Sequence, residues 1–192
     1  MSRNQAGGWR LEAGGKAPRW AWWVATGFGS GYLKPAPGTW GSLAAVIVWL
    51  GMRRLVAHHL PGGGPVDGWL FYGILPAMAL TWVAIRASDA VAKETGAKDP
   101  SYIVVDEWAG QWFALVPLWL LVPFKGPVLF LDPKALVPFL LFRLFDIWKP
   151  GVINDLQAMP GGKGIVMDDV LAGLYAAIAS TLLLFLTPLG RL

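Results

Sequence analysis

The sequence contains no cysteine and only two histidines, the adjacent His58 and His59. The missing cysteines exclude disulfides, a thiolate nucleophile and cysteine-ligated zinc or iron–sulfur centres. Charged residues are also scarce, because Asp, Glu, Lys and Arg make up 15% of the chain, against roughly 25% of an average soluble domain. The net charge of +4 is small and scattered. It does not indicate a nucleic-acid partner, although it has the sign that anionic lipid headgroups attract.

Apolar residues dominate what is present. They form 55% of the 192 residues, and the chain includes 12 tryptophans and 15 prolines. Tryptophan suits membrane interfaces, and proline is tolerated in packed membrane helices. The mean hydropathy of +0.50 points the same way. The composition therefore predicts an integral membrane protein, and the length is most simply that of one domain.

The first 20 residues are basic, with Arg3, Arg10, Lys16 and Arg19, and they contain no apolar core long enough for a signal peptide. We interpret residues 1–26 as a basic, mostly flexible N-terminal arm on the cytoplasmic side. Residues 27–192 are expected to form a single membrane-embedded domain.

Five apolar segments are candidates for helices. Three have the length that crosses a bilayer, about 17–20 residues, and they cover residues 69–85, 108–124 and 170–189. Two are weaker: residues 43–52, which could extend to 39–59, and residues 135–148, which contain Arg143 and Asp146. We therefore expect an all-α fold, a compact multi-helix membrane-embedded bundle of about five apolar helices. Three of these would be membrane-inserted, and two would be re-entrant or interfacial.

The order of these segments predicts a topology. If the N-terminus is cytoplasmic, alternation places residues 88–107 and 149–168 on the same side, and residues 61–68 and 125–134 on the other. Five carboxylates then lie on one membrane face, each at the end of an apolar helix: Asp106, Glu107, Asp146, Asp168 and Asp169.

Each acidic pair alone has a simple structural explanation, because acids stabilise the first turn of a helix. Together, however, such carboxylates repel one another unless a cation neutralises them. Oxygen-rich sites suit Mg²⁺, with Mn²⁺ as the alternative. We therefore predict that these five carboxylates form an acidic metal site at the cytoplasmic face, with either one ion or two.

Four cations are candidates for binding phosphate. Arg143 and Asp146 are i,i+3 neighbours, so a plain ion pair is the alternative, yet ionisable residues inside membranes are functional by default. Arg143 offers a bidentate fork and Lys149 a point charge. Lys34 and Lys163 lie in glycine-rich segments that are equally consistent with flexible turns. The segment around Lys163 does not match the phosphate-binding P-loop pattern.

Three blocks of the sequence together resemble a known family. They read "GSGYLKPAPGTWGSLAA", "DPSYIVVDEWAGQW" and "FRLFDIWKPGVI…PGGKGIVMDDVLAG", and they span most of the chain, roughly from Gly27 to Gly173. Their order and spacing resemble the signature blocks of the phosphatidylglycerophosphatase A family. One departure is that many members carry an acidic residue where Gln157 stands, whereas this chain has Asp155 two positions earlier.

The resemblance implies a Mg²⁺-dependent lipid phosphatase of phospholipid biosynthesis, in the bacterial inner membrane with its active site facing the cytoplasm. Its substrate would be phosphatidylglycerophosphate, and its products phosphatidylglycerol and phosphate. The site residues that it implies are Asp106, Glu107, Asp146, Lys149, Asp168 and Asp169. Because cysteine is absent and the histidines are adjacent, we expect direct attack by a metal-activated water, in line with the leaving oxygen.

Two other functions are weighed against this one. A CDP-alcohol phosphatidyltransferase also has clustered aspartates, but its pattern requires a different continuation after "DG" than the "WLFYG" that follows Asp67. A small cation transporter would spread its carboxylates through the depth of the membrane rather than collect them at one face. The oligomeric state and activity on other lipid phosphates stay open.

Overall fold

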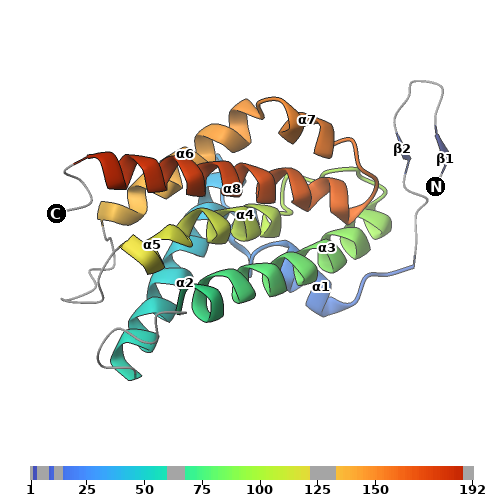
Figure 1. The fold of residues 1–192 in the computed structure, drawn as a ribbon. Helices are drawn as coiled ribbons and strands as arrows, with labels where there is room; N and C mark the ends of the chain where they lie inside the picture. The colour runs from blue at the N-terminus through green and yellow to red at the C-terminus, as the bar shows by residue number, and fades with distance from the viewer. Residues whose placement is uncertain (1, 4–8, 11–14, 60–67, 122–132, 188–192) are drawn as a thin grey trace.

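The computed structural model describes residues 2–3, 9–10, 15–59, 68–121 and 133–187 (Figure 1). Within these residues the fold is helical, apart from two antiparallel strands of two residues each, β1 (Ser2–Arg3) and β2 (Trp9–Arg10). The predicted all-α fold class is therefore confirmed.

The helices follow one another with short connections. In chain order they are α1 (Arg19–Ala25), the 3₁₀ turn η1 (Ser30–Tyr32), α2 (Pro37–His59), the π-helical η2 (Trp69–Ile74), α3 (Leu75–Thr95), α4 (Val105–Leu115), α5 (Pro117–Leu121), α6 (Pro133–Trp148), α7 (Val152–Leu156) and α8 (Gly162–Leu186).

Three of the described helices are long and apolar enough to cross a membrane. They are α2, the continuous η2–α3 helix over Trp69–Thr95, and α8. At 1.5 Å per residue, the 25 residues of α8 measure about 37 Å, which exceeds the roughly 30 Å of a hydrocarbon core. Large apolar side chains project outward from these helices, including Met78, Trp82 and Phe185. The predictions for residues 69–85 and 170–189 are confirmed in that both regions form helices long and apolar enough to span a bilayer, although residues 188–189 lie outside the described residues. The fold is consistent with a membrane protein.

The prediction that residues 108–124 form a spanning helix is wrong. Helix α4 ends at Leu115 and α5 begins at Pro117, a residue without the N–H that a continuous helix needs. The 11 residues of α4 measure only about 17 Å. Most of the α4 side chains are buried against other helices, so this apolar run reflects burial in protein. Helix α2, the weaker candidate of the sequence, provides the third span instead.

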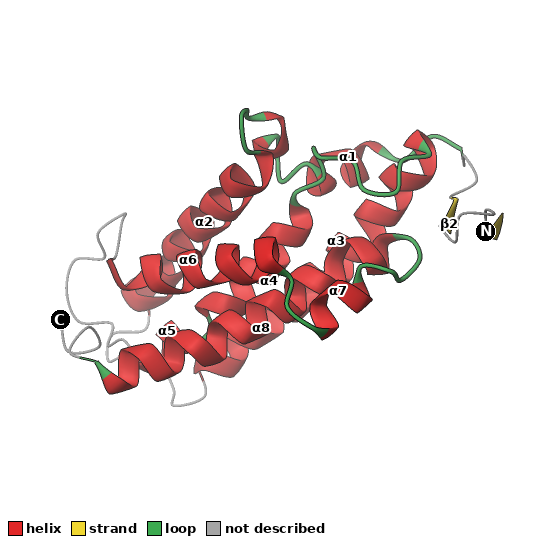
Figure 2. Ribbon diagram, turned by 90° about the horizontal axis from the view of Figure 1, so that it is seen from above, coloured by secondary structure: helices red, strands yellow, loops and turns green. Residues whose placement is uncertain are grey.

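Helix α8 packs against α3, α4 and α6, and Figures 1 and 2 show α3, α4 and α8 side by side along the length of the bundle. Two glycines bring α4 and α8 into backbone contact. A Cβ on Gly110 would overlap the backbone of Asp169, and one on Gly173 would overlap the backbone of Gly110. The missing side chains therefore fix Asp106 and Glu107 on α4 close to Asp169 on α8.

Five helix ends meet at one end of this bundle. Helices α2, α4 and α8 begin there, α6 ends there, and α3 is followed by Asp99, which lies at the same end. This agrees with the predicted alternation, which puts residues 88–107 and 149–168 on one side. His58 and His59 end α2, about 30 Å along its axis from this end. Loop residues 61–67 and 125–132 lie outside the described residues.

The predicted N-terminal arm includes helix α1. Its Ala21 and Ala25 are fully buried against Ala87 and Val91 of α3. This helix is therefore part of the hydrophobic core, and the boundary between arm and domain at residue 26 stays a prediction.

Candidate functional site

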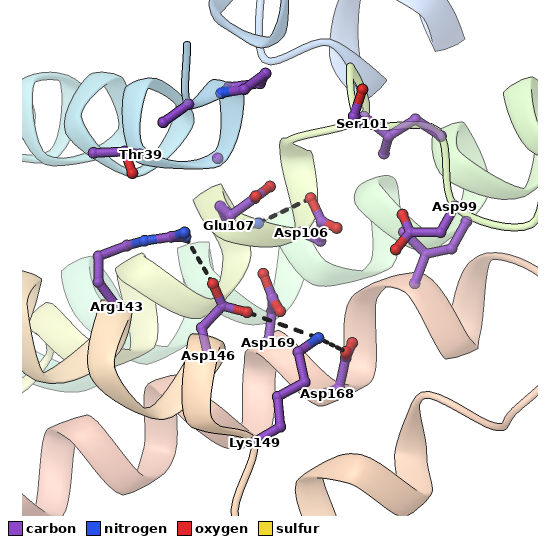
Figure 3. Close-up of a pocket in the computed structure, with 15 residues that line it drawn as sticks. Thr39, Asp99, Ser101, Asp106, Glu107, Arg143, Asp146, Lys149, Asp168 and Asp169 are labelled. Atoms are coloured by element: carbon purple, nitrogen blue, oxygen red, sulfur yellow. Dashed lines mark hydrogen bonds and ion pairs between the residues drawn. The ribbon is translucent and has the colours of Figure 1, made fainter. Parts of the chain in front are cut away.

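A pocket of about 260 Å³ opens where the helix ends meet (Figure 3). Its walls come from the start of α2, the segment before α4, and the near ends of α4, α6 and α8. It contains all five carboxylates that the sequence predicts as metal ligands, together with two of the four predicted cations: Asp106, Glu107, Asp146, Asp168, Asp169, Arg143 and Lys149.

The carboxylates of Asp106, Glu107 and Asp169 form the centre of the pocket. One carboxylate oxygen from each lies within 4.8 Å of the others. Asp106 is 7% exposed and Asp169 is 3% exposed. Burial raises the pKa of the Asp106 carboxyl well above its usual range, and the neighbouring Glu107 raises it further. A cation held between these oxygens would remove that repulsion.

Helix capping, the simple alternative for these acids, applies only to α4, because Asp106 and Glu107 lie in its first turn whereas α8 has no acidic residue in its first turn. The Asp106 Oδ1 accepts a hydrogen bond from the Glu107 N–H at 3.0 Å. However, Glu107 Oε2 and Asp168 Oδ1 are buried and have no hydrogen-bond partner within the described residues. Buried carboxylate oxygens without partners are costly, and hard oxygen donors are what Mg²⁺ and Mn²⁺ bind. The residues therefore fit a divalent cation.

Arg143 and Lys149 line the opposite wall, held by two of the carboxylates (Figure 3). Arg143 Nη1 lies 2.7 Å from Asp146 Oδ2 and donates to Ser42 Oγ at 3.3 Å. Lys149 Nζ lies 2.6 Å from Asp168 Oδ2 and 3.8 Å from Asp146 Oδ1. Burial would lower the pKa of the Lys149 ammonium, but its hydrogen bond to Asp168 and the surrounding carboxylates outweigh burial and raise it.

The start of α2 closes the pocket from the side. Gly38 lies directly against the Glu107 carboxylate, and a Cβ there would lie 3.3 Å from Arg143 Nη2. The glycine therefore lets α2 approach both charged groups, while the neighbouring Thr39 lines the cavity. Six carboxylates face two cations in this pocket, so its formal charge without a metal is strongly negative. A phosphate group would be repelled unless a cation were also present.

Asp99 is a further acidic residue of the pocket that the sequence did not single out. It lies on the exposed rim, two residues before Ser101, which also lines the cavity. Burial of the carboxyl group raises the pKa of Asp99, although Lys149 and Lys98 oppose the rise. Its sequence signal was weak, because Asp99 precedes a proline and Asp–Pro pairs are typical of turns.

The remaining predicted cations lie elsewhere. Lys34 and Lys163 are exposed and do not line the pocket, so their role in phosphate binding stays a prediction. Asp155 lies on α7, where it is exposed and also outside the pocket.

Comparisons with known proteins agree on one family. The model of the phosphatidylglycerophosphatase A family matches residues 23–184. A protein of Bacteroides thetaiotaomicron named as a candidate phosphatidylinositol-3-phosphatase is 37% identical, over 81% of this chain and 87% of its own. Phosphatidylglycerophosphatase A of Escherichia coli is 32% identical over 80% of this chain and 77% of its own. The Haemophilus influenzae enzyme of that name is 33% identical over 81% of this chain and 83% of its own. No solved structure matches this chain.

Proposed function

This chain belongs to the phosphatidylglycerophosphatase A family, and from that membership we propose that it is a membrane lipid phosphatase. It hydrolyses phosphatidylglycerophosphate to phosphatidylglycerol and inorganic phosphate. The observation that carries this proposal is the convergence of five carboxylates with Arg143 and Lys149 in one pocket at the end of the bundle.

The depth of the pocket suits a phosphate at the membrane surface. Gly162 at the start of α8 lies against Ile85 and Asp89 of α3. Asp168 is six residues further along α8, or about 9 Å, which places it near the depth of Trp82 on the antiparallel α3. Trp82 is 63% exposed, with Arg86 stacked on its ring at 5.3 Å. Tryptophan and arginine are typical of the interface between lipid and water.

Magnesium is the cation that we propose for the site, and manganese would suit the same donors. Asp106, Glu107 and Asp169 would hold it, because their oxygens lie closest together, and Asp146 and Asp168 would complete the acidic shell. When bound, the ion would supply positive charge for the phosphate oxygens and would lower the pKa of a water. Whether one ion or two bind is left open by this arrangement.

The side chains of the pocket have separate roles in the reaction. Arg143 and Lys149 bind and orient the phosphate oxygens, and the Arg143 Nε–H, buried without a partner in the described structure, is one donor for this. Asp146 keeps both cations in place. Glu107, which would help to hold the cation, orients the attacking water by accepting a hydrogen bond from it, and the proton of that water passes to solution. The water oxygen bonds to phosphorus, the bond to the glycerol oxygen breaks, and that oxygen takes a proton from solution.

We further propose that the protein lies in the cytoplasmic membrane of a bacterium, with this pocket on the cytoplasmic side. The bacterial relatives support this. The packing of α1 against the end of α3 that lies nearest the pocket supports a basic N-terminal region on the same side as the pocket.

Phosphate release from detergent-purified protein tests the proposal. Phosphatidylglycerophosphate is supplied with Mg²⁺ or with a chelator, and phosphatidylinositol 3-phosphate serves as the competing substrate. We expect release only with the metal, and faster release from phosphatidylglycerophosphate. No release from either lipid in the presence of Mg²⁺ would refute the phosphatase proposal. Faster release from the inositol lipid would refute phosphatidylglycerophosphate as the preferred substrate.

Two matched variants test the site. Asp169→Asn should lower turnover by at least about 100-fold, because the variant removes a charge from the centre of the pocket. Asp155→Asn removes the same charge from an exposed position outside the pocket and should leave turnover unchanged. Near-normal activity of Asp169→Asn would show that Asp169 is only a structural residue.

A further inference from the structure

A second cavity, of about 510 Å³, lies on the α1–η1 segment and shares no lining residue with the acidic pocket. Four aromatic side chains form most of its wall: Trp22, Trp23, Phe28 and Tyr32. Arg19 contributes a charge, and Thr26 lies at its base with its hydroxyl already bonded to the Trp22 carbonyl. We call this the aromatic cavity.

The large apolar side chains around the aromatic cavity are mostly exposed. Trp23 is 63% exposed, Phe28 65% and Tyr32 59%, and the adjacent Trp20 and Leu33 are each 50% exposed. A contiguous apolar patch of this kind marks an interaction surface, and clustered tryptophan and tyrosine are typical of membrane interfaces. Phe28 also has a left-handed backbone, with φ of 55°, which is unfavourable for a residue other than glycine.

The charge of the aromatic cavity favours an anion. Within the described part of the chain Arg19 forms no ion pair, and Lys16 and Lys34 are exposed nearby in the sequence. The Glu94 carboxylate of α3 accepts hydrogen bonds from Ala17 N–H at 2.9 Å and Trp22 Nε1–H at 2.8 Å. Glu94 therefore fixes the Trp22 ring in the wall and does not pair with Arg19.

The depth of α1 places this cavity at the membrane surface. Ala21 and Ala25 pack in one cluster with Ala84, Ala87 and Val91 of α3. This stretch of α3 begins between Trp82 and Arg86 and continues toward the aqueous end of the helix. A ligand in the cavity would therefore lie among lipid headgroups and the first carbons of the acyl chains.

Contacts of Tyr102 and Val104 connect the aromatic cavity to the segment that lines the acidic pocket. Tyr102 stacks on Trp22, with ring centroids 5.7 Å apart, and lies 6.2 Å from the Tyr32 ring. The preceding residue, Ser101, lines the acidic pocket. Val104 N–H donates to the Ala25 carbonyl at 2.8 Å, which ties the same segment to α1. Residues 101–104 therefore form a wall of the acidic pocket, through Ser101 and Ile103, and contact side chains that line the aromatic cavity, through Tyr102.

We propose that the aromatic cavity binds an anionic phospholipid of the surrounding bilayer, as a site separate from the acidic pocket. The Arg19 guanidinium holds the lipid phosphate, and the four aromatic rings cover the glycerol and the upper part of one acyl chain. The bound lipid anchors α1 and η1 in the interface and thereby supports the wall formed by residues 101–104.

A single fluorescent label tests this directly, because the chain has no cysteine of its own. Trp20→Cys places a unique label on α1 beside the aromatic cavity but outside its lining. The full chain is placed in two sets of phosphatidylcholine nanodiscs. One set contains brominated phosphatidylglycerol, and the other contains the same fraction of brominated phosphatidylcholine. We expect the anionic lipid to quench the label about fivefold more effectively, which is the preference that one arginine gives at a membrane surface.

A matched pair of variants locates the preference. Arg19→Gln in the labelled protein should bring the ratio of the two quenching efficiencies close to one. Arg54→Gln, the same loss of charge on an exposed residue near the other end of α2, should leave the ratio unchanged. Equal quenching by both lipids, or a preference that survives Arg19→Gln, would overturn the proposal. Absence of quenching by either lipid would also overturn it, and would indicate that another protein covers this surface. The measurement needs no turnover, so it stands or falls independently of the phosphatase activity.

Discussion

The backbone contact between α4 and α8 makes a sharp prediction for Gly173→Ala. The added Cβ would lie 2.8 Å from the Gly110 carbonyl carbon and 3.0 Å from its Cα. Carbon atoms that are not bonded normally lie about 3.5–4.0 Å apart, so the two helices would have to separate by about 1 Å. Overpacking of this kind typically costs about 1–3 kcal/mol of stability.

The same shift should also impair catalysis. The Asp169 carboxylate on α8 would move away from Asp106 and Glu107 on α4, and a misplacement of about 1 Å in a catalytic site can cost about 100-fold in rate. We therefore expect Gly173→Ala to lower both the thermal unfolding midpoint and the rate of phosphate release. Tryptophan fluorescence in detergent reports the midpoint, and released phosphate reports the rate.

Gly51→Ala is the matched control. Gly51 lies in α2, is exposed, and has nothing within 4 Å of the position that a Cβ would occupy. Alanine in an exposed helix is favoured over glycine by roughly 0.5–1 kcal/mol, so this variant should be fully active and slightly more stable. If Gly173→Ala kept both the wild-type midpoint and the wild-type rate, the close helix contact would not be what positions the carboxylates.

Two further predictions concern the charges of the pocket. Lys149→Gln removes the partner of the Asp168 carboxylate and should lower stability by about 1–3 kcal/mol and raise the KM for lipid. An unchanged KM and an unchanged midpoint would contradict the role of Lys149. The second prediction follows from the raised pKa of Asp106. The folded protein binds the Asp106 proton more tightly than the unfolded chain does. Protonation of Asp106 therefore stabilises the fold at low pH, and this stabilisation is lost as the pH rises through the raised pKa. With a chelator the unfolding midpoint should therefore fall as the pH rises from the ordinary range of an aspartate carboxyl through the raised pKa of Asp106. Mg²⁺ should remove most of that fall, and a midpoint independent of pH would refute this.

The long helices were predictable from the sequence where an outward-facing surface requires apolar residues. Many apolar residues within 69–85 and 170–186 are exposed on the surface of the bundle, and both ranges lie in helices long and apolar enough to span a membrane. Residues 108–124 have the same apolar character for a different reason, since α4 is buried within the bundle. Hydropathy does not distinguish burial in lipid from burial in protein, and only the break at Pro117 hints at the difference.

The composition of the acidic pocket was predictable because the acids lie at or within about two turns of helix ends that the alternation of helices brings together. The geometry of the acidic pocket was not predictable from the sequence. The contact that sets the distance between Asp106 and Asp169 depends on Gly110 and Gly173, which are 63 residues apart in the chain, and neither glycine has a local signal. Asp99 was missed because only the tertiary fold turns its loop over the pocket.

The fixed depth of Asp168 and Asp169 on α8 has a kinetic consequence. These carboxylates are anchored to a helix that crosses the bilayer, so the pocket samples phosphates within a thin two-dimensional layer. The concentration that governs its rate is then the mole fraction of substrate in that layer rather than the amount in the whole solution. Adding inert lipid or detergent at constant total substrate should slow the reaction by surface dilution, even though every substrate molecule stays accessible.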